Sequence, residues 1–88
     1  MIASTIVTVN IAGEKAQYDM ELPASIPIRE LSPKLLMALK NLELRLFLGV
    51  ERIKIKLDAE NRYLNPGETL ASVGVWDGSI ITVERMVP

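Results

Sequence analysis

The sequence predicts an α+β fold in which one main helix packs across a mixed sheet of four to five strands. Three observations predict it: two alternating segments joined by a glycine-containing turn, one apolar stripe with helical spacing, and further alternating segments in the second half. The chain has 88 residues, of which 49% are hydrophobic and 24% charged. That length and balance favour one globular domain spanning residues 1–88.

The first two strands are predicted to form a β-hairpin. Residues 4–11 are rich in β-branched side chains and place Val7, Val9 and Ile11 on one apolar face. Residues 12–15 contain a glycine and predict a turn, and residues 16–22 again alternate between apolar and polar side chains. The hairpin therefore has one face in the core and one in water.

A helix is predicted to follow the hairpin. Apolar side chains recur at spacings of three and four and form a single stripe, which consists of Ile28, Leu31, Leu35, Leu39 and Leu42. Pro33 leaves two starting points open. Either the helix begins near Ile28 and Pro33 removes one hydrogen bond inside it, or Ser32 caps a helix that begins at Pro33.

The second half predicts the remaining strands. Residues 52–57 alternate strictly, with Ile53, Ile55 and Leu57 facing inward. A polar turn at 58–61, a short strand at 62–64 and a short helical turn within 68–75 follow. Residues 77–78, Asp-Gly, predict the turn into a last strand over 79–86. The predicted order is β-β-α-β-β-(short helix)-β.

Composition excludes several classes of function. The chain contains no cysteine and no histidine, so disulfides, thiolate catalysis and the commonest general base and zinc ligand are absent. Its carboxylates lack metal-loop spacing, and no glycine-rich phosphate loop occurs. With a net charge of −1, binding of nucleic acid is disfavoured. We therefore expect a protein without catalytic residues, cofactor or metal.

No segment predicts export or membrane insertion. The first ten residues lack the basic and apolar regions of a signal peptide, and no run approaches the ~20 apolar residues of a transmembrane helix. The expected location is the cytoplasm, without direct membrane insertion.

Several motifs carry a resemblance to known proteins. The element order and the closing segment, with Leu64, Leu70 and Gly-Val-Trp-Asp-Gly at 74–78, resemble the ubiquitin-like β-grasp fold. Residues 18–23, Tyr-Asp-Met-Glu-Leu-Pro, and residues 26–31, Ile-Pro-Ile-Arg-Glu-Leu, resemble the YukD/EsaB family of type VII secretion. They are equally similar to the ubiquitin-like N-terminal domain of EccD membrane subunits. The resemblance covers nearly the whole chain.

This resemblance implies a bacterial, non-catalytic accessory or regulatory protein of a secretion system. Its expected partners are proteins, namely membrane ATPase or channel subunits, which would hold it at the inner face of the membrane. Alternatives are a generic β-grasp adaptor in an unrelated complex and a ubiquitin-like modifier or sulfur carrier. The terminal residues Arg-Met-Val-Pro at 85–88 disfavour the last, because carriers of that class end in Gly-Gly.

Five residues are candidates for protein contacts, each with a purely structural alternative. Arg52, Lys54 and Lys56 form either a solvated strand face that discourages edge pairing or a contact stripe for an acidic partner. Trp76 either packs over the sheet edge or is an exposed interface residue. Phe47 belongs to the apolar run 44–50, which either covers the open end of the core or forms a patch for a partner or for weak homo-oligomer formation.

Overall fold

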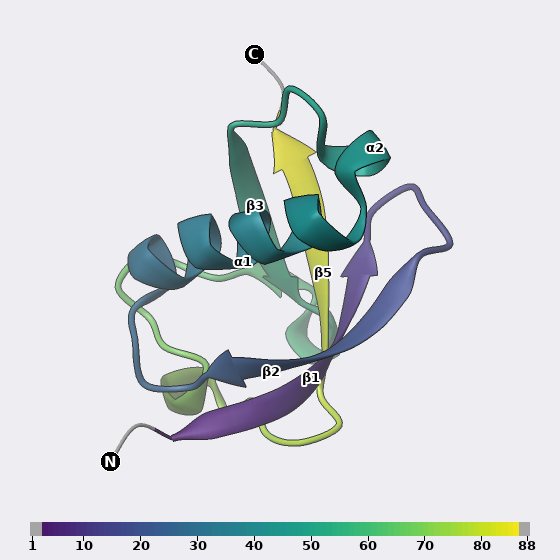
Figure 1. The fold of residues 1–88 in the computed structure, drawn as a ribbon. Coiled ribbons are helices and arrows are strands. Elements are labelled where there is room, and N and C mark those ends of the chain that lie inside the picture. The colour runs from purple at the N-terminus through teal and green to yellow at the C-terminus, as the bar shows by residue number, and fades with distance from the viewer. Residues whose placement is uncertain (1–2, 87–88) are drawn as a thin grey trace.

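The structure is a five-stranded mixed sheet with one long helix across one face (Figure 1). This computed structural model describes residues 3–86. The strands lie in the order β2-β1-β5-β3-β4. Their bounds are β1 Ser4–Ile11, β2 Gln17–Pro23, β3 Arg52–Leu57, β4 Arg62–Tyr63 and β5 Ile80–Met86. β1 runs parallel to β5 and every other pair is antiparallel, which confirms the predicted fold class.

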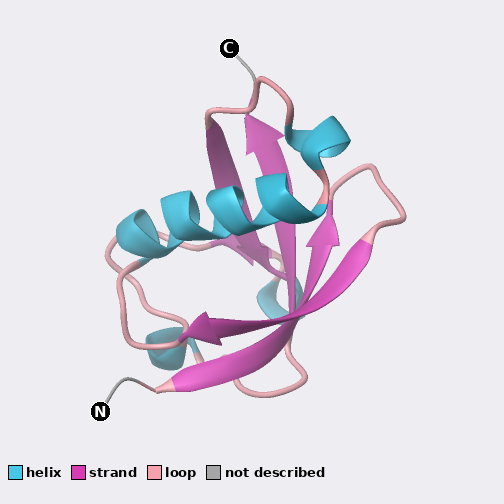
Figure 2. Cartoon of the chain, in the orientation of Figure 1, coloured by secondary structure: helices cyan, strands magenta, loops and turns pink. Residues whose placement is uncertain are grey.

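The main helix α1 (Ile28–Leu42) crosses one face of the sheet (Figure 2). Short helical segments follow it: α2 (Leu44–Phe47), η1 (Asp58–Glu60) and η2 (Ala71–Val73). The predicted apolar stripe is buried in the core except for one member. One member of the stripe was predicted wrongly, because Leu42 is 53% exposed. The helix ends at Leu42 and the chain turns at Glu43 into α2, so Leu39 is the last residue of α1 that contributes to the core.

The start of α1 is fixed by a distant loop. The helix begins at Ile28 and contains Pro33, and no side chain caps its first turn. Instead, the Ile28 amide donates to the Glu68 carbonyl oxygen at 2.8 Å, and the Arg29 amide donates to the Pro66 carbonyl oxygen at 3.0 Å. These contacts satisfy amides that have no partner inside a helix, so the first of the two predicted starting points is correct.

The inward faces of the strands and α1 form one core. Val7, Val9 and Ile11 are buried as predicted, and so are Ile53, Ile55 and Leu57. The remaining fully enclosed side chains are those of Leu31, Leu35, Leu39, Phe47, Leu70, Ile81 and Val83. The face of the sheet opposite α1 is not covered by this core.

The apolar run 44–50 divides between core and surface. Phe47 has an exposed fraction of 0% and Val50 is buried, whereas Leu44 and Leu48 are exposed. The sequence did not predict α2, whose single turn points Phe47 into the core. The prediction that Phe47 contacts a partner is therefore wrong, because no part of its side chain reaches the surface.

Two expectations concern the ends of the chain. None of the helices within residues 3–86 has the length and apolar character that crossing a membrane requires. The C-terminal residues Val87 and Pro88, on which the expectation against conjugation rests, lie outside the described residues.

Candidate functional site

The three basic candidates form a row on the outer face of β3. Their β5 neighbours in the register are Met86 for Arg52, Glu84 for Lys54 and Thr82 for Lys56. Arg52 and Lys54 are exposed and Lys56 is half-buried. We call Arg52, Lys54 and Lys56 the basic row.

Lys54 lies over an aromatic ring whose hydroxyl is bound to a carboxylate. Its Nζ lies 5.2 Å from the centre of the Tyr63 ring, which is cation–π geometry. The Tyr63 hydroxyl donates to Glu84, and this hydrogen bond raises the pKa of Tyr63 above its usual range. Glu84 therefore offsets part of the charge at the centre of the basic row, while Arg52 and Lys56 flank it along the strand.

The opposite side of the outer face carries carboxylates. Ser4 donates to Glu21 at 2.8 Å and Thr8 donates to Asp19 at 2.9 Å, so hydroxyls of β1 hold both acidic side chains of β2. In the strand order, β1 and β5 separate these carboxylates from the basic row. The outer face is thus acidic at its β2 side and basic at its β3 side.

Trp76 lies in the turn that leads into β5. Trp76 is 77% exposed, which contradicts the alternative that it packs over the sheet edge and leaves the exposed one. Two hydrogen bonds hold the turn: the Trp76 amide donates to the Ser79 hydroxyl at 3.1 Å, and the Gly78 amide donates to the Ile6 carbonyl oxygen at 2.9 Å. The fold therefore presents an exposed tryptophan on an ordered support, a feature that is enriched at interface hot spots.

Asp77 fixes this turn to β1. One carboxylate oxygen accepts from the Ile6 amide at 2.8 Å and from the Thr5 hydroxyl at 3.1 Å. Thr5 is the one buried polar residue among residues 3–86, and Asp77 satisfies it. The Asp-Gly motif identified the turn in the sequence, but nothing local in it identified Thr5 as the partner.

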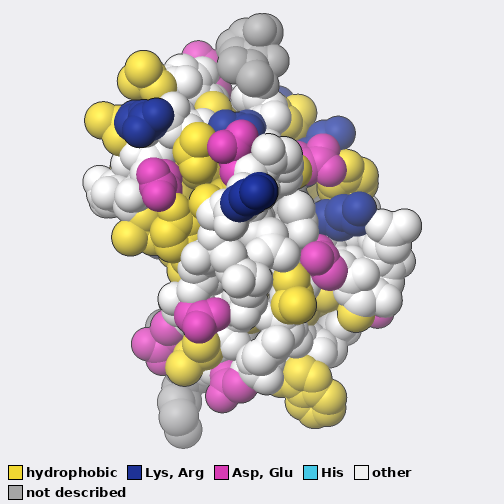
Figure 3. Space-filling view, turned by 90° about the vertical axis from the view of Figure 1, so that its right-hand side faces the viewer, with side chains coloured by type: hydrophobic (Ala, Val, Ile, Leu, Met, Phe, Trp, Pro, Cys, Tyr) yellow, Lys and Arg dark blue, Asp and Glu magenta, His cyan; other side chains and the backbone are white. Residues whose placement is uncertain are grey.

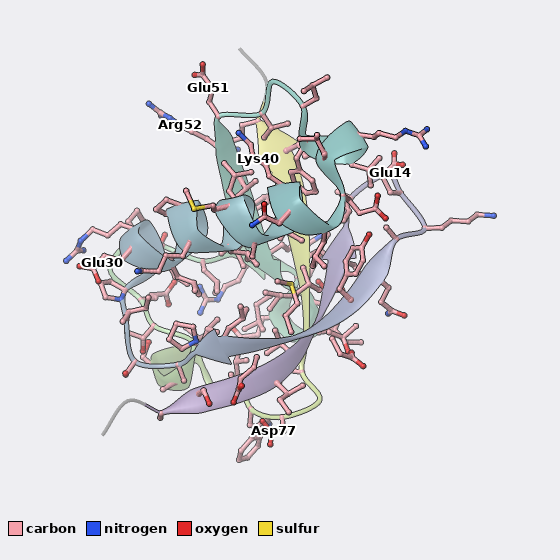
Figure 4. The ribbon with its side chains drawn as sticks, in the orientation of Figure 1. Glu14, Glu30, Lys40, Glu51, Arg52 and Asp77 are labelled. Carbon is pink, nitrogen blue, oxygen red and sulfur yellow. The ribbon has the colours of Figure 1, made fainter. Side chains whose placement is uncertain are left out.

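The candidates do not converge on one place. Arg52 lies at the start of β3, at the opposite end of the molecule from Asp77 and hence from the Trp76 turn (Figure 4). The exposed leucines of the α2 region, Leu42, Leu44 and Leu48, form a third location. Figure 3, which faces the side where α2 lies, shows hydrophobic and basic side chains next to one another in its upper part.

A charged cluster orders the loop that holds the start of α1. Arg62 donates to both carboxylate oxygens of Glu68 at 3.1 Å and to Glu60 at 2.7 Å. Glu68 also accepts from the Asn65 amide at 2.7 Å. The hydrogen bonds that Glu68 accepts from Arg62 and then from the Asn65 amide lower the pKa of the Glu68 carboxyl below its usual value. The hydrogen bonds that Arg62 donates to Glu68 and Glu60 raise the pKa of Arg62.

Acid is expected to weaken this loop. Because the pKa of Glu68 is lower in the folded chain, its contribution to stability is complete above its ordinary value of 4.5 and is lost as the pH falls through the folded value. In urea unfolding at pH 7 and pH 3, Glu68→Gln should show a smaller loss of stability on acidification than the unchanged protein. Glu30→Gln, on an exposed position of α1, is the matched control. An equal loss in all three proteins would contradict the expectation.

Residues 3–86 contain no group of three or more acidic side chains placed to hold a metal ion.

Comparison with solved structures identifies the fold. The EccD5 ubiquitin-like domain from Mycobacterium xenopi is similar with a TM-score of 0.76 at 21% identity, covering 98% of both chains. The ubiquitin-like domain of the Mycobacterium tuberculosis type VII secretion system protein ECCD1 is similar with a TM-score of 0.75 at 22% identity, covering 94% of this chain and 99% of that one. A ubiquitin from Caldiarchaeum subterraneum shares the fold at 15% identity, a TM-score of 0.65 and 98% coverage of both chains.

Longer chains contain the same fold as one part. In the MycP5-free ESX-5 inner membrane complex, the similarity covers 97% of this chain and 21% of that chain, with a TM-score of 0.74 at 22% identity. This chain therefore spans about a fifth of that relative. A comparison with curated proteins finds no significant match. A family model matches residues 6–83, which is most of the chain, and on this evidence the chain belongs to the YukD family of the WXG100 protein secretion system.

Proposed function

We propose that this protein is a non-catalytic ubiquitin-like docking component, accessory or regulatory, of a type VII-like secretion system. The observation that carries the proposal is the YukD family match over residues 6–83. The similarity to domains of the ESX-5 inner membrane complex and the ESX-3 core complex supports it. In this proposal the protein works at the cytosolic face of the membrane, bound to membrane ATPase or channel subunits.

Two surfaces would make the contacts. The Trp76 turn offers a large exposed ring on an ordered support, which suits a hot spot. The basic row suits an acidic partner surface and would accelerate association more than it would slow dissociation. Since Arg52 lies at the opposite end of the molecule from Asp77, which belongs to the Trp76 turn, a substitution at Arg52 should leave that turn intact.

Affinity capture from the native cells tests the proposal. The tagged protein is purified in mild detergent, and the bound proteins are identified by mass spectrometry. We expect a membrane ATPase or a channel subunit of the secretion system with the unchanged protein. We expect at least a tenfold lower recovery with a variant that carries Arg52→Glu, Lys54→Gln and Lys56→Glu. Lys54 is changed to glutamine because a glutamate would stand directly opposite Glu84.

A matched variant shows whether loss of the partner depends on the position of the changed charges or only on the net charge. Lys15, Lys34 and Arg45 are exposed and lie outside the basic row, so Lys15→Glu, Lys34→Gln and Arg45→Glu cause the same change in charge elsewhere. This variant should retain the partner. Recovery of only proteins unrelated to export, or of an activating enzyme and lysine-linked adducts, would contradict the proposal.

A further inference from the structure

β3 has an edge that is only partly covered. On one side β3 pairs with β5 along its whole length, from Arg52 to Leu57. On the other side β4 pairs only with Lys56 and Leu57, and the Leu64 amide donates to the Ile55 carbonyl oxygen at 2.9 Å. Within the described part of the chain, the first half of β3 therefore has no strand on that side.

The backbone of Ile53 faces this open side. In an antiparallel ladder, successive residues direct their amide and carbonyl groups alternately to the two sides of the strand. Ile55 uses its carbonyl group on the β4 side, so Ile53, two residues away, directs its amide and carbonyl groups to the same side. One donor and one acceptor of β3 are thus placed for a further strand.

A groove of about 670 Å³ runs beside this edge, between α1 and β3. Its lining is mainly apolar and includes Ile28, Leu36, Ile53 and Leu64. Pro33 and Pro66 line it too. Because proline has no amide hydrogen, neither residue offers a backbone donor that could pair with a bound strand in place of β3. The groove thus offers apolar contacts next to free backbone groups, the combination on which binding by strand addition depends.

The charges around the groove select its occupant. Arg29, Arg52 and Lys54 line it, against the single carboxylate of Glu51. A second copy of β3 would bring Arg52 and Lys54 against the same two residues, and like charges placed opposite one another in a ladder are unfavourable. A segment with carboxylates would be attracted instead.

We propose that this groove binds an extended segment of a partner protein that alternates apolar residues with Asp or Glu and adds a sixth strand at the free edge of β3. The inference rests on the proposed docking function for its biological setting. The groove shares Arg52 and Lys54 with the basic row. In this inference, both residues attract the carboxylates of the bound segment.

Selection from a library of random displayed peptides tests this inference without a known partner. The immobilised full chain should enrich peptides that alternate apolar and acidic residues. A synthetic copy of the best peptide, added to the isotope-labelled protein, should slow hydrogen exchange of the Ile53 amide as measured by NMR. Ser32→Trp, which places a large ring in the groove, should weaken binding of this peptide at least tenfold. Lys34→Trp is the matched control, since Lys34 lies on α1 outside the groove lining and should leave binding unchanged.

The outcomes separate this inference from the proposed function. Enriched peptides that are not acidic, that bind Ser32→Trp unchanged, or that do not protect Ile53 would overturn the inference. Failure of the library to yield any binder would also overturn it. The charges of β3 would then be explained as residues that discourage edge pairing with another chain. Capture of secretion subunits from cells depends on neither result, so the docking function could still hold. Dimer formation that Ser32→Trp abolishes would make a second copy the occupant.

Discussion

Replacing Phe47 by alanine is expected to lower the free energy of unfolding by about 3–5 kcal/mol, the usual cost of removing a buried aromatic ring. Phe47 is enclosed completely, and it is the largest of the fully buried side chains. Because small domains are stable by only about 5–15 kcal/mol, the variant should unfold at much lower urea concentration or temperature. Chemical unfolding monitored by circular dichroism measures the effect.

Leu48 provides the control for this experiment. It follows Phe47 directly in the chain but is 75% exposed, so Leu48→Ala should change the unfolding free energy by less than about 0.5 kcal/mol. Equal destabilisation by the two substitutions would mean that α2 does not direct Phe47 into the core. The same contrast decides which variant should test self-association: Leu48→Asp changes the surface, whereas a charge at Phe47 would disrupt the fold.

Asp77→Ala is expected to destabilise the protein by about 1–3 kcal/mol, because it leaves the buried Thr5 hydroxyl without a partner. It also removes the acceptor of the Ile6 amide, so the turn that carries Trp76 should become more mobile. Urea unfolding measures the first effect, and the fluorescence anisotropy of the single tryptophan measures the second.

A double-mutant cycle isolates the contact between Asp77 and Thr5. Once Asp77→Ala has been made, adding Thr5→Val should cost much less than Thr5→Val alone, since no hydroxyl then remains unsatisfied. Strictly additive effects would show that the carboxylate stabilises the turn without the help of Thr5.

Local patterns in the sequence were sufficient to predict most of the fold. The alternation in residues 4–11 and 52–57 placed the correct side chains in the core, and the spacing of Ile28, Leu31, Leu35 and Leu39 gave the buried face of α1. These features depend on neighbours along the chain, so periodicity is enough to read them.

The features that the sequence left open or did not predict depend on how the chain packs. The start of α1 is determined by the carbonyl groups of Pro66 and Glu68, which lie far along the chain, and not by a capping side chain. Composition could not distinguish Phe47 from Leu48, because only the single turn of α2 decides which of them faces inward. The groove beside β3 follows in part from the shortness of β4, which the sequence predicted. Its other wall comes from α1, and the sequence did not predict that α1 lies beside this edge.

The most direct test of the docking function is secretion itself. The gene is deleted in the native organism, and export of WXG100 proteins is measured with and without complementation. We expect deletion to reduce export or the expression of the secretion genes, and the unchanged protein to restore it. Trp76→Ala, at an exposed position that should not affect folding, is expected to restore it incompletely. Unchanged export together with unchanged expression of the secretion genes after deletion would contradict a role in this secretion system.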